Sequence, residues 1–407
     1  MSWPPHNRRL TTATNGLQLP AVLQSVDPTS LRGEWGRYVP TREQVSMEIS
    51  IVGLPLAGKT TVFNALTGSQ EQVSAYSTGR CEVRPAVVEV PDPRVDVLSR
   101  MYKPRKTTRA KIQFNDISGM SKGQAQSGGF DTQLLAAMGK SDALLEVMRA
   151  FQSDEVPHPD DRVDPAADLG SLRVELILAD LGTVERRIER IHAKLKKASN
   201  KEKPLQEAEL ALMQRFAKTL ESEVPIGNLD LSEEEERMIR GFCFLTAKPA
   251  MVVVNLGEDG DPAMDLSWAN HHRQTTALAL KGALEMEISQ LPPDETELFL
   301  ESYGIEEPSL NVMVRECYRL LGLMSFFTVG EDEVRAWTVH RGATAVEAAG
   351  AIHTDLARGF IRAEVISYDD MIACETLAEV RRQGKVHLQG KDYVVQDGDI
   401  LNVRFNV

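Results

Sequence analysis

A short glycine-rich turn, Gly53-Leu-Pro-Leu-Ala-Gly58-Lys59-Thr60, restricts the fold of this chain more than any other feature. The apolar run before it, "EISIV", predicts a buried strand, and "KTTVFNALTG" after it predicts a helix that ends at Gly68. In such a strand–turn–helix unit the glycines let backbone N–H groups surround phosphate oxygens, the lysine reaches the β- and γ-phosphates, and the threonine ligates Mg²⁺. We therefore predict a nucleotide site that includes Gly53, Leu54, Pro55, Leu56, Ala57, Gly58, Lys59, Thr60 and Thr61.

Strand and helix patterns alternate around this turn. Up to about residue 150, "AVVEV" and "KIQFND" predict further strands, and "PRVDVLSRMY" and "FDTQLLAAMGKS" predict helices. The alternation resumes at 249–258, where "PAMVVVNLGE" predicts another buried strand before the helix "ALKGALEMEISQL". This order predicts an α/β fold with a mostly parallel sheet between two layers of helices.

A helical hairpin interrupts the alternation. Apolar residues spaced 3 and 4 apart predict a heptad seam on one long helix, and Pro204 is well placed to open the return helix. The predicted seam and return positions are Val174, Ile177, Leu181, Val184, Ile188, Ile191 and Leu195, then Leu205, Leu212, Phe216 and Leu220.

The C-terminal part is rich in strands. After a connecting helix at "NVMVRECYRLLG", the runs "EVRAWTVH", "FIRAEVIS" and "ILNVRFNV" predict strands. Thr344 and Glu347 form a capping box that should start the single helix "AVEAAGAIHTDLARG". We expect a small mixed sheet with one helix across it.

These patterns predict the following division of the chain. Residues 1–46 form a flexible leader, and Met47 is an alternative start because it directly precedes the first strand. The nucleotide-binding domain occupies 47–160 and 241–303, the hairpin 161–240, the connecting helix 304–323 and the C-terminal domain 324–407.

Net charge, cysteine spacing and hydropathy argue against several classes of protein. The net charge of −13 argues against a surface that binds nucleic acid over its whole extent. The four cysteines are far apart and suggest neither a disulfide framework nor a zinc site. The chain contains no apolar run long enough to span a membrane, and its first residues lack the apolar core of a secretion signal. We expect a cytoplasmic protein, and a monomer because the hairpin covers its own seam.

A second motif, "IQFNDISGM", predicts the metal site and a switch. Asp116 ends a strand, as an aspartate that holds Mg²⁺ must, and Gly119 completes a D-x-x-G sequence in which the glycine N–H senses the γ-phosphate. Met120 stands where Ras-like proteins place the glutamine that orients the attacking water. A water-positioning group would therefore have to come from elsewhere.

A third motif, Asn255-Leu256-Gly-Glu258, follows the strand "MVVV" and predicts the base contact. Guanine sites carry Asn-Lys-x-Asp at this place. Glu258 is longer than aspartate and Leu256 replaces the lysine, so the geometry is poor for guanine. We therefore predict ATP rather than GTP, while a polar loop without a role in binding remains open.

Together these residues resemble the YchF family of Obg-like ATPases, from Met47 to Val407. The most specific segments are "EVPDPR", "ELILADL", "LTAKPA", "GEDEVRAWTV", "AAGAIHTDLARGFIRAEVI" and "KDYVVQDGDILNVRFNV". The resemblance implies a P-loop NTPase of the G-domain type, a C-terminal β-grasp (TGS) domain, a preference for ATP, and association with ribosomes. Three positions depart from the family pattern: Leu56 replaces an asparagine linked to monovalent cations, Arg80 replaces the Mg²⁺-binding threonine of switch I with Thr78 close by, and the family's G-L-G-N reads Gly129-Phe-Asp-Thr132.

Two basic segments could contact ribosomal RNA, the hairpin residues 185–203 and the run at 103–111. Solvated helix faces explain the first equally well from sequence alone. Three functional readings stay open: an Mg²⁺-dependent ATPase in which Lys59 and Gly119 take part in catalysis, a nucleotide-gated ribosome-binding module with negligible turnover, and an Obg-like GTPase.

Overall fold

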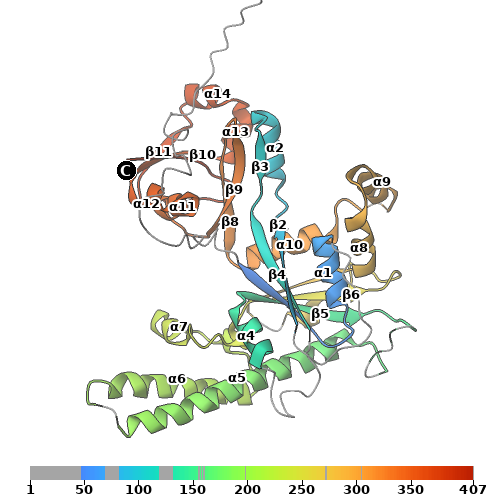
Figure 1. The fold of residues 1–407 in the computed structure, drawn as a ribbon, viewed down its shortest axis with the longest axis vertical. Coiled ribbons are helices and arrows are strands. Elements are labelled where there is room, and N and C mark those ends of the chain that lie inside the picture. The colour runs from blue at the N-terminus through green and yellow to red at the C-terminus, as the bar shows by residue number, and fades with distance from the viewer. Residues whose placement is uncertain are drawn as a thin grey trace, which may run out of the picture.

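The structure is a computed structural model, and it describes residues 47–68, 82–118, 132–154, 156, 158, 161–197, 199–270, 273–303 and 305–406 (Figure 1). The predicted leader, residues 1–46, lies outside the described residues. The described elements build two six-stranded sheets and one long helical hairpin.

The first sheet has the strand order β2-β4-β1-β5-β6-β7. All neighbouring strands are parallel except β2 and β4, which confirms the predicted, mostly parallel sheet. Strand β6 is buried along its whole length because helices cover both faces of the sheet. The strands are β1 (Glu48–Val52), β2 (Val83–Glu89), β4 (Lys111–Ile117), β5 (Ala143–Ala150), β6 (Ala250–Leu256) and β7 (Thr275–Leu280).

Alternate side chains of this sheet enter two different cores. Ile51, Phe114 and Val253 pack on the side of α1 and α10, whereas Val52 and Val252 pack on the side of α4 and α5. The alternation follows from the two-residue period of a strand. The helices around the sheet are α1 (Lys59–Thr67), α4 (Thr132–Lys140), α5 (Pro165–Leu195), α8 (Gly282–Gln290), α9 (Pro293–Tyr303) and α10 (Ser309–Leu320).

The predicted hairpin is formed by α5 and α6 (Lys203–Glu221), which extend away from the sheet in Figure 1. Ile177, Val184 and Ile191 of α5 pack against Phe216 of α6, which confirms the heptad seam. Two predicted members are wrong: Val174 and Leu205 are 36% and 67% exposed and do not belong to the buried cluster of the hairpin. The short elements nearby are η2 (Ile226–Asn228), α7 (Glu233–Ile239), η3 (Leu245–Ala247) and η4 (Ser267–Ala269).

The second sheet has the order β11-β10-β12-β8-β9-β3 and carries α11 across one face. Five of its strands come from the C-terminal part of the chain. The sequence predicts β9, β10 and β12, whereas β8 and β11 were not predicted. The elements are β8 (Leu323–Thr328), β9 (Glu333–His340), α11 (Ala345–Ile352), α12 (Thr354–Arg358), β10 (Phe360–Ile366), α13 (Tyr368–Cys374), α14 (Leu377–Arg382), β11 (His387–Gln389) and β12 (Ile400–Phe405).

The helix predicted after Thr344 begins as expected but does not continue. Thr344 and Glu347 form the predicted capping box. At His353 the backbone becomes extended (φ −164°, ψ 142°), and the imidazole Nδ1 accepts the N–H of Asp355 at 3.1 Å. His353 therefore ends α11 and caps α12, so the single predicted helix is wrong.

The edge strand of the second sheet comes from the first half of the chain. Between β2 and β4 the chain leaves the first sheet as α2 (Pro93–Tyr102) and β3 (Lys106–Thr108), and β3 pairs in parallel with β9. Figure 1 shows α2 and β3 alongside β8 and β9. Buried residues of α2, such as Leu98, share one continuous core with Phe327 and Ile400 of the C-terminal part.

Charged side chains reinforce this contact. Arg94 of α2 pairs with Asp92 at 2.8 Å and with Asp397 at 2.9 Å, and its guanidinium lies 5.1 Å from the ring centre of Phe327. In the predicted basic segment 103–111, Lys106 pairs with Glu333 at 3.4 Å. Arg105 pairs with Asp332. Arg109 pairs with both Glu89 and Asp96. The segment is therefore largely neutralised within the chain, which weakens the expectation that it contacts RNA.

Candidate nucleotide-binding site

The predicted phosphate-binding turn joins β1 to α1, and its backbone requires glycine at two positions. Gly53 has φ +155°, and a Cβ there would lie 2.4 Å from the carbonyl oxygen of Val147 on β5. Gly58 has φ +92° and caps α1. Leu56 also has a positive φ, +63°, which is unfavourable for a residue with a Cβ. The turn is thus held in a strained conformation against the end of β5.

Lys59 folds back over the turn. Its Nζ donates to the carbonyl oxygens of Gly53 and Leu54, each at 3.0 Å. Burial lowers the pKa of Lys59 to about 8, although the charge of Asp116 opposes that shift. A buried ammonium group over a ring of backbone groups is suited to an anionic ligand, because phosphate oxygens can replace the carbonyl partners.

Thr60 and Asp116 meet at the end of β4, as the sequence predicts. The hydroxyl of Thr60 donates to Asp116 Oδ2 at 3.1 Å. Asp116 is 3% exposed, and its buried Oδ1 accepts no hydrogen bond from the residues that the structure describes. Burial raises the pKa of Asp116, whereas Lys59, the Thr60 hydroxyl and Arg84 lower it. A buried carboxylate oxygen without a donor, next to a threonine hydroxyl, fits a Mg²⁺ ion, which prefers oxygen ligands.

Asn255 at the end of β6 connects two loops of the site. Its Nδ2 donates to the carbonyl oxygen of Ala57 at 3.2 Å, and its Oδ1 accepts the N–H of Gly282 at 3.0 Å. The side chain of Asn255 leaves no room for a Cβ on either neighbour. A Cβ on Gly58 would lie 2.1 Å from its Nδ2, and a Cβ on Gly282 would lie 2.6 Å from its Oδ1. Asn255 thus positions the phosphate-binding turn, and its predicted contact with the base stays a prediction.

The other two residues predicted to contact the base, Leu256 and Glu258, differ in their exposure to solvent. Glu258 is exposed, and its carbonyl oxygen accepts a bond from Lys281 Nζ at 2.5 Å. Leu256 is 5% exposed and packs beneath Gly260. Glu258 is therefore available to a ligand at the rim, whereas Leu256 supports the loop from below.

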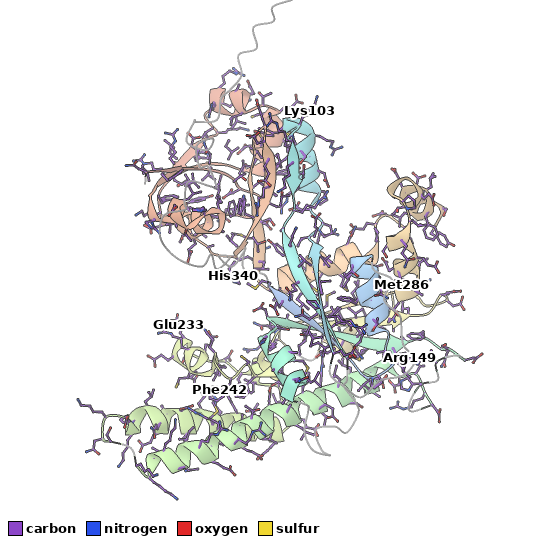
Figure 2. The ribbon with its side chains drawn as sticks, viewed as in Figure 1. Lys103, Arg149, Glu233, Phe242, Met286 and His340 are labelled. Carbon is purple, nitrogen blue, oxygen red and sulfur yellow. The ribbon has the colours of Figure 1, made fainter. Side chains whose placement is uncertain are left out.

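Sequence reasoning missed several residues of this site. The ring of Phe151, just after β5, lies 3.8 Å from the Cβ position of Gly58, and its Cβ lies 3.4 Å from that of Gly257. The guanidinium of Arg149, labelled in Figure 2, stacks on this ring at 4.4 Å and is 2% exposed by residue. Lys281 and Gly282 were also missed. The signal was their position at the end of β5 or directly after β5 and β7, because ligands of parallel sheets bind at the carboxyl ends of the strands.

Some predicted residues lie outside the described part of the chain: Gly119, Met120, Thr78 and Arg80. Within the described ranges, no three His, Cys, Asp or Glu side chains gather as a metal cluster, and no helix is long and apolar enough to cross a membrane.

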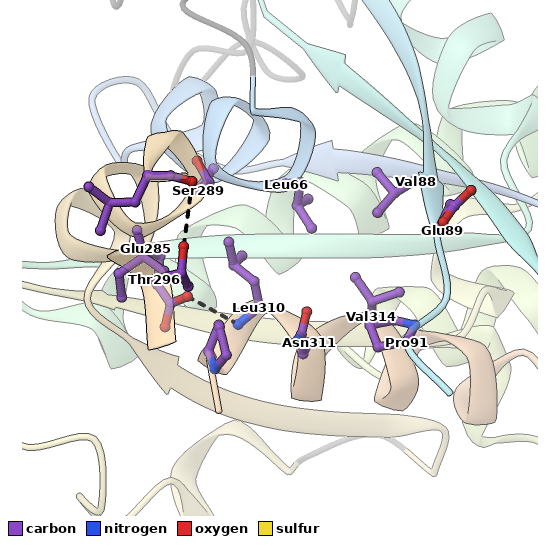
Figure 3. A pocket seen from close by; sticks show the side chains of 14 residues that line it. Leu66, Val88, Glu89, Pro91, Glu285, Ser289, Thr296, Leu310, Asn311 and Val314 are labelled. Carbon is purple, nitrogen blue, oxygen red and sulfur yellow. Dashed lines mark hydrogen bonds between the residues drawn. The ribbon is translucent and has the colours of Figure 1, made fainter. Parts of the chain in front are cut away.

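A cavity of about 420 Å³ lies away from this site, between the end of α1, β2, α8 and α10 (Figure 3). Its wall is mainly apolar, with Leu66, Val88 and Val314 among the lining residues. Glu285 lies beside it and accepts the backbone N–H of Ser309 at 2.7 Å, so this carboxylate caps α10. None of the predicted site residues lines the cavity.

Comparison with known proteins agrees with the site. The chain is 40% identical over 367 residues to "Ribosome-binding ATPase YchF" of Pasteurella multocida, a match that covers 89% of this chain and 100% of that protein. The protein of the same name from Bacillus subtilis is 38% identical over 370 residues, with the same coverage. This chain belongs to the YchF family. Its fold is similar to the solved "Structure of the Schizosaccharomyces pombe YchF GTPase", with a TM-score of 0.75, 29% identity, and coverage of 91% of this chain and 100% of the other.

Family models match two parts of this YchF chain. The model described as "50S ribosome-binding GTPase" matches residues 48–205, which include the phosphate-binding turn and Asp116. The model for the C-terminal domain of YchF GTPases, described as "Protein of unknown function", matches residues 323–406, from the start of β8 to the residue after β12.

Proposed function

We propose that this YchF-family protein is a Mg²⁺-dependent ATPase that associates with the ribosome in the cytoplasm. The observation that carries the proposal is the meeting of Lys59, Thr60 and Asp116 at the end of the glycine turn, where one buried carboxylate oxygen has no donor among the described residues. Monomeric action is proposed as well, since α6 covers the apolar seam of α5.

In this proposal the backbone of the turn and Lys59 bind the β- and γ-phosphates, and Thr60 and Asp116 hold the metal. Bound Mg²⁺ would neutralise charge that develops on the transferred phosphate. Lys59 would exchange its carbonyl partners for phosphate oxygens. The negative charge of the phosphates would then raise the pKa of Lys59, which burial lowers. Gly119 is proposed to sense the γ-phosphate, and Thr78 to complete the metal shell.

The base is proposed to be adenine. The curated relatives are named ATPases, whereas the solved relative and both family models carry the name GTPase. We favour ATP because Glu258 is longer than the aspartate of guanine sites and its neighbour Leu256 offers no polar group to a base.

The test is steady-state phosphate release from ATP and from GTP with Mg²⁺, for the parent protein, Lys59→Ala and Glu258→Asp. Turnover of ATP that exceeds turnover of GTP and is abolished by Lys59→Ala is the expected result. Tight ATP binding with turnover no faster than that of Lys59→Ala would refute the enzyme and favour the nucleotide-gated binding module. A marked preference for GTP would refute the assignment of the base.

The ribosome contact is proposed to use the far end of the hairpin and the C-terminal domain. Arg190, Lys194, Lys196 and Lys197 are exposed, and in the part of the chain that the structure describes they form no ion pair. Arg187, by contrast, pairs with Glu209 at 2.6 Å. Unpaired exposed cations are suited to the phosphates of ribosomal RNA.

Sedimentation with ribosomes in rising salt tests this contact. The double variant Arg190→Gln/Lys194→Gln should bind more weakly and with a shallower salt dependence. Lys140→Gln removes an exposed cation of α4, outside the hairpin and the C-terminal domain, and should bind like the parent protein. Binding that is insensitive to salt, or equal in all three proteins, would contradict the proposed surface.

A further inference from the structure

Arg84 on β2 faces the metal-binding aspartate from the neighbouring strand. In the antiparallel pair of β2 and β4, Arg84 is directly opposite Asp116. The same register places Ala86 opposite Phe114 and Val88 opposite Ile112. Residues directly opposite in an antiparallel pair project from the same face of the sheet. Arg84 therefore lies on the same face of the sheet as the side chains of Phe114 and Ile112.

That face carries α1 and the nucleotide site. Phe114 and Ile112 are buried in the core that contains Val62 and Phe63 of α1, and Ala86 and Val88 pack against the same core. Asp116 itself accepts its bond from Thr60 of α1. Because strand side chains alternate, Arg84 projects toward the side on which the phosphates would bind.

The local charges are consistent with this placement. Burial raises the pKa of Asp116, and the charge of Arg84 is among the influences that oppose this rise, so the guanidinium lies within electrostatic range of Asp116. Its ion pair with Glu82, at 3.0 Å, is exposed: 41% of the Arg84 side chain and 50% of the Glu82 side chain are accessible. Exposed pairs of this kind are weak, whereas a guanidinium binds phosphate oxygens with two parallel hydrogen bonds. A phosphate can therefore displace Glu82.

We propose that Arg84 is a catalytic arginine supplied in cis, which leaves Glu82 and contacts the γ-phosphate as it is transferred to water. This inference rests on the proposed ATPase function and names a further residue of the same site. The attacking water bonds to the γ-phosphorus as the bond to the bridging oxygen of ADP breaks, and ADP leaves with the electron pair of that bond. The proton of the water passes to an oxygen of the released phosphate or to solvent, and Arg84 stabilises the charge on the transferred group without exchanging a proton. Such a role suits a chain with Met120 in place of a glutamine, because an arginine in cis accelerates phosphoryl transfer in other P-loop proteins.

The experiment compares Arg84→Ala with two matched controls by phosphate release from Mg·ATP and by ATP affinity. Arg84→Ala should lower kcat by about 10²-fold, the cost of removing one group that stabilises a transition state, and change the dissociation constant of ATP by less than about threefold. Added guanidinium ion should restore part of the rate in this variant alone. Glu82→Gln breaks the same ion pair but keeps the arginine, and should retain the parent rate. Arg105→Ala removes another exposed, paired arginine, and should also retain it.

A second measurement works even when turnover is negligible. ADP with Mg²⁺ and aluminium fluoride mimics the phosphate during transfer, and Arg84→Ala should weaken binding of this complex by at least tenfold while binding of ADP is unchanged. Loss of this complex in a protein without turnover would support Arg84 and refute only the ATPase proposal. Equal binding of ADP and the fluoride complex by parent and Arg84→Ala, or a kcat within twofold of the parent, would overturn the assignment of Arg84.

Discussion

Replacing Gly282 by alanine tests whether Asn255 positions the phosphate-binding turn. Gly282 is the first residue of α8, and its N–H donates to Asn255 Oδ1 at 3.0 Å. A Cβ on Gly282 would lie 2.6 Å from that oxygen and 3.2 Å from Asn255 Cγ. The amide is buried between two glycines, so it cannot move aside without losing its bond to Ala57.

The cost follows from these contacts. Loss of the bond to Ala57 costs about 1 kcal/mol, and overpacking in a buried site costs about 1–3 kcal/mol. We expect Gly282→Ala to lower the free energy of unfolding by about 2–4 kcal/mol in total. We expect about half of this free energy, roughly 1.4 kcal/mol, to arise from distortion of the phosphate-binding turn. ATP affinity should then fall about tenfold, since 1.4 kcal/mol is a factor of ten in a dissociation constant.

The same substitution should be nearly harmless once the amide is gone. Asn255→Ala removes the three atoms that lie nearest to the new Cβ, so the coupling free energy between the two positions should be about 2 kcal/mol. Urea unfolding and ATP titration of both single variants and the double variant measure it. Gly170→Ala in α5 is the matched control, because nothing lies within 4 Å of its Cβ position. Additive effects of the two substitutions would refute the positioning role of Asn255.

Three further perturbations have defined outcomes. Because burial lowers the pKa of Lys59 to about 8 and bound phosphate should raise it, ATP binding should take up about half a proton at pH 8 and weaken as the pH rises further, which calorimetry in two buffers measures. Leu56→Asn should raise the free energy of unfolding by about 0.5–1 kcal/mol, because asparagine tolerates the positive φ of +63° better than leucine. Arg94→Met should cost about 2 kcal/mol and speed hydrogen exchange in β3 and β9, because it leaves the partly buried carboxylates of Asp92 and Asp397 without their shared cation.

Each of these has its own control. In Lys59→Arg the cation does not titrate, so ATP affinity that still falls above pH 8 would contradict the assignment. Leu54→Asn places the same side chain at a buried position of the turn without a positive φ, and should destabilise. Arg100→Met removes an exposed arginine of α2 and should leave exchange in β3 unchanged. Equal effects of Arg94→Met and Arg100→Met would count against a role of Arg94 in holding α2 and β3 on the second sheet.

Local sequence determined most of the elements and the central chemistry of the site. The glycine turn, Lys59 and Thr60 occupy one short segment whose spacing and flanking runs define a strand–turn–helix unit. The capping box at Thr344 and the heptad seam also depend on residues within a turn or two of each other. Such patterns can be read because the forces that they reflect act between near neighbours in sequence. Strands β5 and β7 were not predicted, since short apolar runs without alternation do not distinguish strand from buried helix.

Only the tertiary structure decided which distant residues meet. Asn255 gives no sign in the sequence that it fills the space between Gly58 and Gly282, and Arg84 gives none that it lies opposite Asp116. The basic segment at 103–111 contains the edge strand β3, which pairs with β9, more than two hundred residues away. These contacts depend on the register of strands and on packing across the two sheets, and neither is encoded within one segment of the chain. The local sequence identifies the residues that would bind phosphate and metal, whereas the tertiary structure determines which distant residues hold them in position.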